Sequence, residues 1–388
     1  MSLLDLWLKS KTALEDKHIQ QIIAIAGSGK LLDGAETSAE FRDFLSHVPS
    51  NVLSRYAEDC FVSKFQDGGL ALQDIVNQVG QRLGFHVEYG RYRGVTGQSG
   101  HDGLWVSPFK DTIIVEVKVT DAFRMELDTL ANYRRSLIQL GKATEEKSSI
   151  LIVVGREDTG GLEAQIRGSR HAWNIRLISV DALIRLMLLK ENIEDPTILR
   201  KISGVLTPQE FTKLDGIIDL VFSAAEEVLQ ETESAIGPDV LLSEDSEKKP
   251  VSFHDACIQR IEKVLNQSLL KQSRATYASP DNSVFVVCAV SKAYKKASAE
   301  FYWYAFHPHQ KEKLKQASEG YVAFGCGSEK AVVMIPFKNF QSWLDEMNIT
   351  RDGDRFYWHV HIRRDERSWM LYPKSGCKKI DLTPYILR

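Results

Sequence analysis

The residues best placed to do chemistry lie in HDGLWVSPFKDTIIVEVK, the stretch from His101 to Lys118. Its apolar second half predicts a buried strand over 112–119, and that strand carries Glu116 and Lys118. Residues two apart share one face of a strand, so the carboxylate and the ammonium should point the same way. Asp102 precedes another short strand, and a hairpin between the two strands would bring its carboxylate beside Glu116. Two carboxylates and an ammonium then meet at one end of a sheet.

Such a group of side chains is suited to phosphodiester hydrolysis. Carboxylate oxygens are good ligands for Mg²⁺, with Mn²⁺ as a substitute, and Mg²⁺ is commonly held by one or two carboxylates with waters and phosphates. A metal there polarises a phosphoryl oxygen and lowers the pKa of bound water. The lysine would orient or deprotonate that water and offset developing charge. The structural alternative is a lysine–glutamate pair exposed at the edge of a sheet.

Apolar periodicity predicts the elements that must position these groups. Residues 70–83 place Leu72, Ile75, Val76 and Val79 on one helical face, and Gly84 is expected to end that helix. Strands alternate with helices after it, which favours an α/β fold with a mixed sheet flanked by helices. The expected strands are 86–93, 103–106, 112–119, 149–155 and 174–180, and the expected helices are 122–140, 160–172, 181–190 and 207–231.

Asp102 and, fourteen residues later, Glu116-Val117-Lys118 resemble the PD-(D/E)xK signature of the restriction-endonuclease-like nucleases, with His101 where that motif usually has proline. The expected order of helix, three strands, helix and strand is also similar to the core of that family. The resemblance covers about residues 60–190. It implies Asp102 and Glu116 as metal ligands, the Val117 carbonyl as a further ligand, and Lys118 as the catalytic lysine.

The helix before the first strand departs from the family pattern. Many members carry a glutamate there, and this chain has Gln73-Asp74. Gln73 flanks the apolar stripe and is expected to face the site, whereas Asp74 lies further round the helix. Glutamine in place of this glutamate puts both the binding of a second metal ion and full activity in question. The later crossover helix of the family often approaches the DNA, and its candidate contacts here are Gln165, Arg167, Ser169 and Arg170; a solvated helix face is the alternative.

The chain is expected to have four parts. Residues 1–60 form a helical N-terminal segment, and residues 61–230 form the nuclease-like domain with trailing helices. An acidic linker, broken by proline, follows over 231–250. The charge then changes sign: residues 1–250 hold 28 Lys and Arg against 38 Asp and Glu, and residues 251–388 hold 21 against 14. The last part is expected to be a basic α+β domain for DNA recognition or regulation.

Aromatic residues are dense in this C-terminal domain, in FYWYAF (301–306) and FYWHVHIRR (356–364). Such segments can stack bases, and they can equally form the core of a small sheet. His359 and His361 share a strand face and raise the alternative of a zinc pair. The basic candidates for nucleic-acid contact in this domain are Lys292, Lys295, Lys296, Arg363 and Arg364.

Composition narrows the class of protein. Apolar residues make up 43% of the 388 residues, and five scattered cysteines without a CxxC pair indicate reduced thiols. We found no apolar run long enough to cross a bilayer and no signal peptide, so a cytoplasmic protein is expected.

Three functions remain open at this stage. The first is a DNA endonuclease of restriction or phage-defence type whose C-terminal domain selects the target. The second is a defence nuclease that a ligand or partner switches on through that domain. The third is a nucleic-acid-binding protein with a degenerate core. Double-stranded DNA is the expected substrate. A homodimer would allow both strands to be cut, and the helices at 181–190 and 214–229 could form its interface or pack within the domain.

Overall fold

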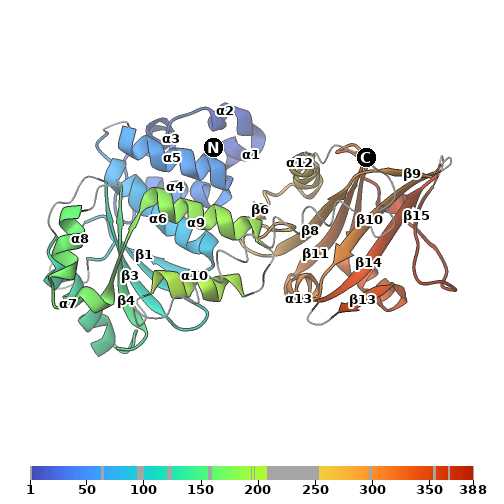
Figure 1. Ribbon diagram of the computed structural model, residues 1–388. Coiled ribbons are helices and arrows are strands. Elements are labelled where there is room, and N and C mark those ends of the chain that lie inside the picture. Colours follow the sequence, from blue (N-terminus) through green and yellow to red (C-terminus); the bar gives the residue numbers. More distant parts are fainter. Residues whose placement is uncertain are drawn as a thin grey trace. The chain divides into compact units, whose positions relative to one another are not determined.

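The computed structural model describes residues 2–62, 65–93, 100–119, 125–155, 160–193, 195, 197–207, 253–296, 299–352, 355–365 and 368–387. The chain divides into two compact units, Met1–Ala224 and Ala225–Arg388 (Figure 1). The linker expected over 231–250 and the helix expected over 207–231, apart from Thr207, lie outside the described residues. Each unit has its own hydrophobic core.

Five helices begin the N-terminal unit, in the segment where short helices were expected. Trp7, Phe41, Phe44 and Tyr56 from this segment are fully buried and join the same core as the helix that follows. The N-terminal helices therefore support the sheet domain through direct packing. Their bounds are α1 (Leu3–Lys9), α2 (Lys11–Glu15), α3 (Ile19–Ile25), α4 (Glu36–His47) and α5 (Ser50–Val62).

The sheet of this unit has five strands in the order β1-β2-β3-β4-β5. The first three strands pair antiparallel, and β3, β4 and β5 pair parallel. The strands and the helices between them confirm an α/β unit with a mixed sheet. Their bounds are α6 (Gly68–Leu83), β1 (His86–Tyr89), β2 (Gly103–Val106), β3 (Thr112–Lys118), α7 (Leu127–Gln139), β4 (Ser148–Val154), α8 (Gly160–Arg167), η1 (Ala172–Asn174), β5 (Ile175–Ser179), α9 (Val180–Asn192) and α10 (Ile198–Leu206).

Helices cover both faces of the sheet, with α7 and α8 on one side and α6 and α9 on the other (Figure 1). Val115 and Val117 belong to the core formed with α6 and α9, whereas Ile114 belongs to the core formed with α7 and α8. This alternation puts Glu116 and Lys118 on the side of Ile114. Charged side chains are rare in a central strand that is buried on both faces. Glu116 and Lys118 are therefore candidates for a functional role.

Helix α6 begins two residues before the expected start and ends where expected. Gly84 has φ +98° and caps the helix, donating its backbone N–H to the carbonyls of Gly80 and Gln81. A left-handed residue of this kind is much easier for glycine than for other residues.

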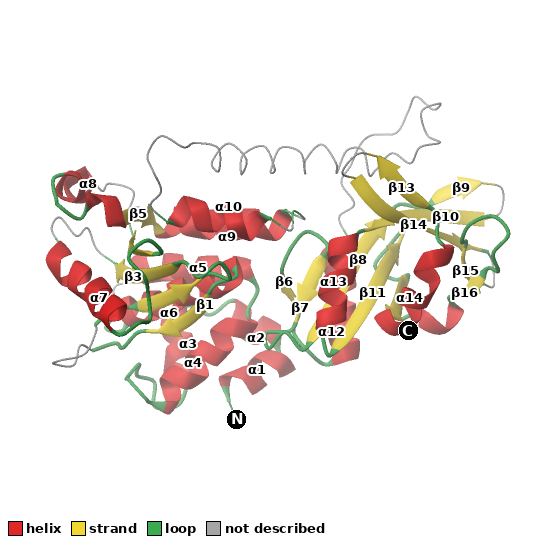
Figure 2. Ribbon diagram, turned by 90° about the horizontal axis from the view of Figure 1, so that it is seen from below, coloured by secondary structure: helices red, strands yellow, loops and turns green. Residues whose placement is uncertain are grey.

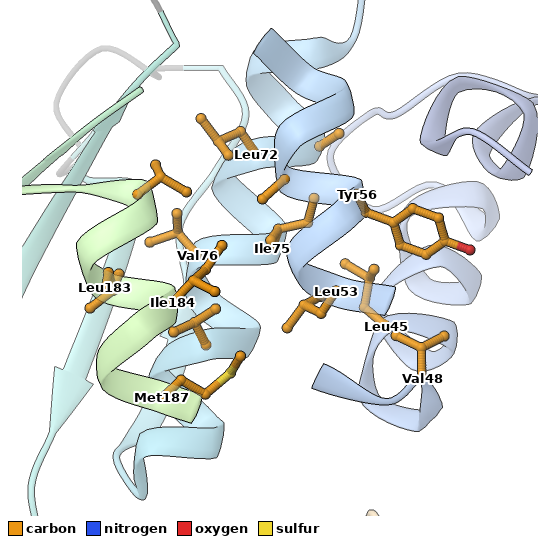
Figure 3. Close-up of a cluster of buried hydrophobic side chains, with 14 of the residues drawn as sticks. Leu45, Val48, Leu53, Tyr56, Leu72, Ile75, Val76, Leu183, Ile184 and Met187 are labelled. Carbon is orange, nitrogen blue, oxygen red and sulfur yellow. The ribbon is translucent and has the colours of Figure 1, made fainter. Parts of the chain in front are cut away.

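Helix α9 packs within its own unit. Leu183, Ile184 and Met187 are buried against Ile75 and Val76 of α6 and their neighbours (Figure 3). The apolar face of the helix expected at 181–190 is therefore buried inside the unit. It no longer supports a dimer interface at this helix. The other candidate helix, at 214–229, lies outside the described residues.

The C-terminal unit contains two sheets. We call the sheet β12-β11-β8-β7-β6 the covered sheet, and the sheet β16-β15-β14-β10-β9, with β13 beside β14, the outer sheet. Its elements are α12 (His254–Leu265), β6 (Leu270–Lys271), β7 (Thr276–Ala278), β8 (Val284–Ser291), β9 (Tyr294–Lys296), β10 (Ala299–Phe306), α13 (Pro308–Gln316), β11 (Glu319–Cys326), β12 (Val332–Pro336), α14 (Phe337–Trp343), η2 (Leu344–Glu346), β13 (Ile349–Asp352), β14 (Arg355–Arg364), β15 (Trp369–Leu371), β16 (Ile380–Asp381) and η3 (Thr383–Tyr385).

The covered sheet is buried on both faces. Helix α12 packs on one face through Cys257, Ile258 and Ile261, which contact Val286 and other strand residues. The other face forms a core with α13, α14 and one side of the outer sheet. The predicted α+β character of this part is confirmed. In the part of the chain that the structure describes, no helix is both long and apolar enough to cross a membrane.

Candidate active site

The hairpin between β2 and β3 places Asp102 beside the charged end of β3. Gly103 lies opposite Val115, and the Asp102 backbone N–H donates to the Val115 carbonyl at 3.0 Å. The Asp102 carboxylate then accepts the backbone N–H of Val117 at 2.7 Å. The carboxylate thus takes the place of the backbone carbonyl that would otherwise accept the Val117 N–H. This contact fixes the carboxylate beside β3. Asp102 and Glu116 are brought together as the hairpin predicted.

Glu116 and Lys118 form an ion pair at this end of the strand. The Lys118 Nζ lies 2.6 Å from Glu116 Oε1, and the side chains are 40% and 12% exposed, respectively. Glu116 is therefore held in the protein while the lysine reaches solvent. Because both side chains point to one face, the expectation from strand alternation is met.

Burial and charge shift the pKa values of this cluster. The pKa of Asp102 is raised to about 7, chiefly by burial and further by the neighbouring Glu116 carboxylate, while the Val117 N–H and Lys118 act in the opposite direction. Burial lowers the pKa of Lys118, but attraction and hydrogen bonding to Glu116, with attraction to Asp102, more than reverse this and raise it. The lysine is thus an ammonium at neutral pH, so this geometry suits charge neutralisation and hydrogen-bond donation better than proton abstraction.

Side chains of helix α6 hold Asp102 through its backbone carbonyl oxygen. Gln73 Nε2 donates to the Asp102 carbonyl oxygen at 3.1 Å, and Asn77 Nδ2 donates to the same oxygen at 2.9 Å. The Gly90 N–H is a third donor, at 2.9 Å. Gln73 therefore faces the site, as expected, through a contact with the main chain.

Asn77 is a site residue that the sequence analysis missed. It is fully buried, and its Oδ1 accepts the Trp105 indole N–H at 2.9 Å while its Nδ2 holds Asp102. A Cβ on Gly103 would stand 2.1 Å from Asn77 Oδ1, so glycine is needed for this approach. Similarly, a Cβ on Gly90 would stand 2.0 Å from the His101 carbonyl oxygen. A polar residue inside an amphipathic helix was the only sequence clue to Asn77.

Asp74, the neighbour of Gln73, belongs to a separate cluster. It is fully buried. Both of its carboxylate oxygens accept the Arg42 Nε–H, each at 3.0 Å, and the Tyr92 hydroxyl also donates to the carboxylate. The Arg42 guanidinium lies between the rings of Tyr89 and Tyr92, 4.6 and 4.9 Å from their centroids. Asp74 is therefore a scaffold residue that ties α6 to α4.

The donor set suits a hard divalent cation. The described residues contain no group of three or more His, Cys, Asp and Glu side chains arranged for a metal. Asp102 and Glu116 nevertheless provide two interacting carboxylates, and a strand residue directs its N–H and C=O to the same side, which places the Val117 carbonyl on the Asp102 side of β3. Two carboxylates, a carbonyl and water fit the preferences of Mg²⁺.

The candidate residues near α8 mostly have partners within the protein. Gln165 exchanges hydrogen bonds with the Met125 backbone, accepting at 3.0 Å and donating at 2.6 Å, and Ser169 donates to the Ile166 carbonyl. Arg167 pairs with Glu163 at 3.1 Å and Arg170 pairs with Asp128 at 2.7 Å, both on the surface. Gln165 and Ser169 have structural contacts, and phosphate contact remains a prediction for the two exposed arginines.

The C-terminal candidates do not all lie on one surface. Arg363 pairs with Asp365 at 2.8 Å, and the exposed Lys292 lies 5.5 Å from the Tyr294 ring centroid. Arg364 is on the opposite side of β14 from Arg363 and pairs with Glu300 at 3.3 Å. Lys295 and Lys296 lie in β9, and their side chains are outside the described part of the structure.

The two histidines of β14 do not form an available metal pair. Trp303 Nε1 lies 2.9 Å from His359 Nδ1, and Thr350 Oγ1 lies 2.7 Å from His359 Nε2. Both ring nitrogens of His359 are therefore used in hydrogen bonds, which argues against the zinc alternative.

No model of a known protein family matches the sequence, and no curated protein matches it closely enough to count as a relative.

Proposed function

We propose that this chain is a metal-dependent DNA endonuclease of restriction or phage-defence type, with a restriction-endonuclease-like core in its N-terminal unit. The observation that carries the proposal is the cluster of Asp102, Glu116 and Lys118 at one end of β3. Two carboxylates with one ammonium leave an excess of negative charge at a partly buried site, and the pKa of Asp102 is raised chiefly by burial and further by Glu116. Perturbed groups of this kind are concentrated at functional sites.

The residues have separate roles in the proposed reaction. Asp102, Glu116 and the Val117 carbonyl would hold Mg²⁺, or Mn²⁺ in its place. When bound, the ion supplies Lewis acidity and lowers the pKa of a bound water. Lys118, as an ammonium, donates hydrogen bonds to a phosphoryl oxygen and offsets the charge that develops on it. Gln73 and Asn77 fix the Asp102 backbone and so fix where its carboxylate lies.

The contact of Gln73 supports a second candidate function, a nucleic-acid-binding protein with a degenerate core. Gln73 is neutral and touches only the Asp102 main chain in its hydrogen bond, so the site is left with two carboxylates. A defence nuclease that requires an activator bound to its C-terminal unit is the remaining alternative. Metal-dependent cutting separates the nucleases from the degenerate binder, and cutting without an added activator separates the two nucleases.

The test is cleavage of plasmid and phage DNA, methylated and unmethylated, in Mg²⁺, Mn²⁺ or EDTA. Lys118→Ala should reduce the cleavage rate about 100-fold or more, the usual scale for a positioned catalytic group. Lys142→Ala removes an exposed lysine of the same unit and should cut like wild type. Equal cutting by wild type and Lys118→Ala, or cutting in EDTA, would contradict the proposal. Binding without any cutting would favour the degenerate binder or the activated nuclease.

A further inference from the structure

Two kinds of aromatic side chain alternate along the outer sheet. Tyr302, Tyr304 and Phe306 of β10 are almost fully buried in the core between the sheets. The residues between them face the other way. We call that other side the aromatic face; it carries Phe301 and Trp303 of β10 and, on the paired strand β14, Tyr357, His359, His361 and Arg363.

Core packing explains the buried set and does not explain the aromatic face. Phe301, Trp303 and Tyr357 are half-buried and belong to none of the hydrophobic clusters formed by the described residues. In Figure 2 the helices α12, α13 and α14 are all drawn below β13, β14, β10 and β9. Adjacent large rings on a sheet surface that none of the described helices covers point to a binding surface.

Hydrogen bonds hold the central rings in place. The Trp303 indole N–H can only donate, so His359 Nδ1 accepts, and His359 Nε2–H in turn donates to Thr350 Oγ1. His359 is therefore neutral in this chain of hydrogen bonds. Burial lowers the pKa of His359, which favours the same neutral form. A surface that is already ordered loses less conformational entropy when it binds a ligand.

Trp303 makes edge-on and tilted contacts with its neighbours, whereas His359 and His361 are stacked with an interplanar angle of 13°. Trp303 meets Tyr357 at an interplanar angle of 79° and His359 at 55°. Neither contact is a parallel stack, and among the described residues Trp303 has no parallel stacking partner. A flat ligand that stacks on the indole would therefore not have to replace a parallel ring.

Two cations lie beside these rings. The Arg363 guanidinium lies 5.3 Å from the Phe301 centroid, and the Lys379 ammonium lies 4.4 Å from that of Tyr372. Among the described residues, two carboxylates lie close by: Asp365, which pairs with Arg363, and Asp381, at the sheet edge. Residues 251–388 as a whole hold 21 Lys and Arg against 14 Asp and Glu. Rings for bases with cations for phosphates are the combination used by single-strand-binding surfaces.

We infer that the aromatic face binds unpaired bases of a single-stranded nucleic acid, with Trp303 as the main stacking residue. The inference rests on the proposed function, because it gives the C-terminal unit the task of holding a strand for the nuclease. Bases inside a duplex are stacked on each other and do not offer their faces to a protein, so the ligand must be a single strand or an unwound segment. The excess of positive charge favours this polyanion over an apolar protein partner.

The test uses full-length Lys118→Ala protein in EDTA, so that the probe is not cut. Short fluorescein-labelled single strands of mixed sequence, in DNA and RNA form, are titrated beside the DNA duplex and unlabelled polyphosphate as competitor. Trp303→Ala should weaken single-strand binding about 10-fold or more, the scale of one lost base–aromatic stack. Trp303→Phe keeps a ring and should lose less. The matched control is Trp173→Ala, which removes a 68% exposed tryptophan of the N-terminal unit.

Several results would overturn the inference. These are wild-type single-strand affinity in a folded Trp303→Ala protein, no single-strand binding at all, or complete competition by polyphosphate, which has no bases. If Trp303→Ala does not fold, Phe301→Ala takes its place with the same expectation. Cleavage by the wild-type protein is measured separately. If the wild type binds single strands but does not cut DNA, only the nuclease proposal fails. If it cuts DNA but its single-strand binding does not depend on Trp303, only the present inference fails.

Discussion

Asp74 is a fully buried carboxylate of the N-terminal unit and Asp102 a half-buried one, and their surroundings are opposite. The pKa of each is raised, chiefly by burial, and the net values are about 6 for Asp74 and about 7 for Asp102. Arg42 and Tyr92 then stabilise the ionised form of Asp74, so its charge is matched. Asp102 instead faces a second carboxylate, Glu116, which disfavours its ionised form.

We interpret this difference as one between a structural charge, Asp74, and a proposed functional charge, Asp102. A buried carboxylate with a complete set of partners holds elements together, as Asp74 holds α6 to α4. A pair of carboxylates that shares one lysine carries a charge excess that folding alone does not require. That excess is the property expected of a site that binds a cation. Variants that change one carboxylate at a time test this difference between Asp74 and Asp102.

The largest effect is expected for Asp74→Ala, which should lower the free energy of unfolding by about 3–4 kcal/mol because Arg42 and the Tyr92 hydroxyl lose their acceptor. Urea denaturation measures this change. Asp43→Ala serves as the matched control, since it removes an exposed carboxylate of α4 and should change stability by less than about 0.5 kcal/mol. Equal, small effects of the two variants would show that the Arg42–Asp74 pair has no special structural role.

The next effect is on the pH dependence of stability. Because the folded-state pKa of Asp74 is raised from 3.8 to about 6, the native state binds its proton more tightly than the unfolded state. The stability that this provides is fully present below about pH 3.8 and is lost as the pH rises to about 6. The stability of wild type relative to Asp74→Asn should therefore fall by about 2–3 kcal/mol between pH 4 and pH 7. A difference that is flat or rises with pH contradicts this assignment.

Asn77→Ala should have a smaller effect on stability and a separate effect on activity. The buried Trp105 N–H loses its acceptor and the Asp102 carbonyl loses one of three donors, at a cost of about 2 kcal/mol. Cleavage per folded molecule should also fall, because the Asp102 backbone is less firmly held. Denaturation curves and single-turnover cleavage rates measure the two effects. Loss of stability with an unchanged cleavage rate would limit Asn77 to the fold.

The candidate site was predictable where it depends on strand geometry. Alternation along 112–119 placed Glu116 and Lys118 on one face, and a short hairpin placed Asp102 beside them. Asn77 was not predictable, because its role depends on which backbone group packs against α6. The partner of Gln165 was hidden for the same reason, since Met125 is distant in sequence.

The fold followed the same division. Long apolar segments such as β3 and β4 were predicted closely, because burial on both faces leaves a continuous apolar run. β6, β7 and β13 are short strands whose place in a sheet is decided by their neighbours, and the sequence carries little trace of them. The segment FYWYAF was open to two interpretations. The core interpretation is confirmed for Tyr302, Tyr304 and Phe306, and base stacking by the residues between them stays a prediction.

The most direct test of the account compares Asp102→Asn with Asp74→Asn in single-turnover cleavage of a labelled DNA duplex in Mg²⁺, with the folded fraction of each protein measured by denaturation. We expect Asp102→Asn to be as stable as wild type within about 1 kcal/mol, since it removes an excess charge, and to show no cleavage. Asp74→Asn should be less stable and should cut at the wild-type rate per folded molecule. Wild-type cleavage by Asp102→Asn, or loss of cleavage by folded Asp74→Asn, would contradict the account.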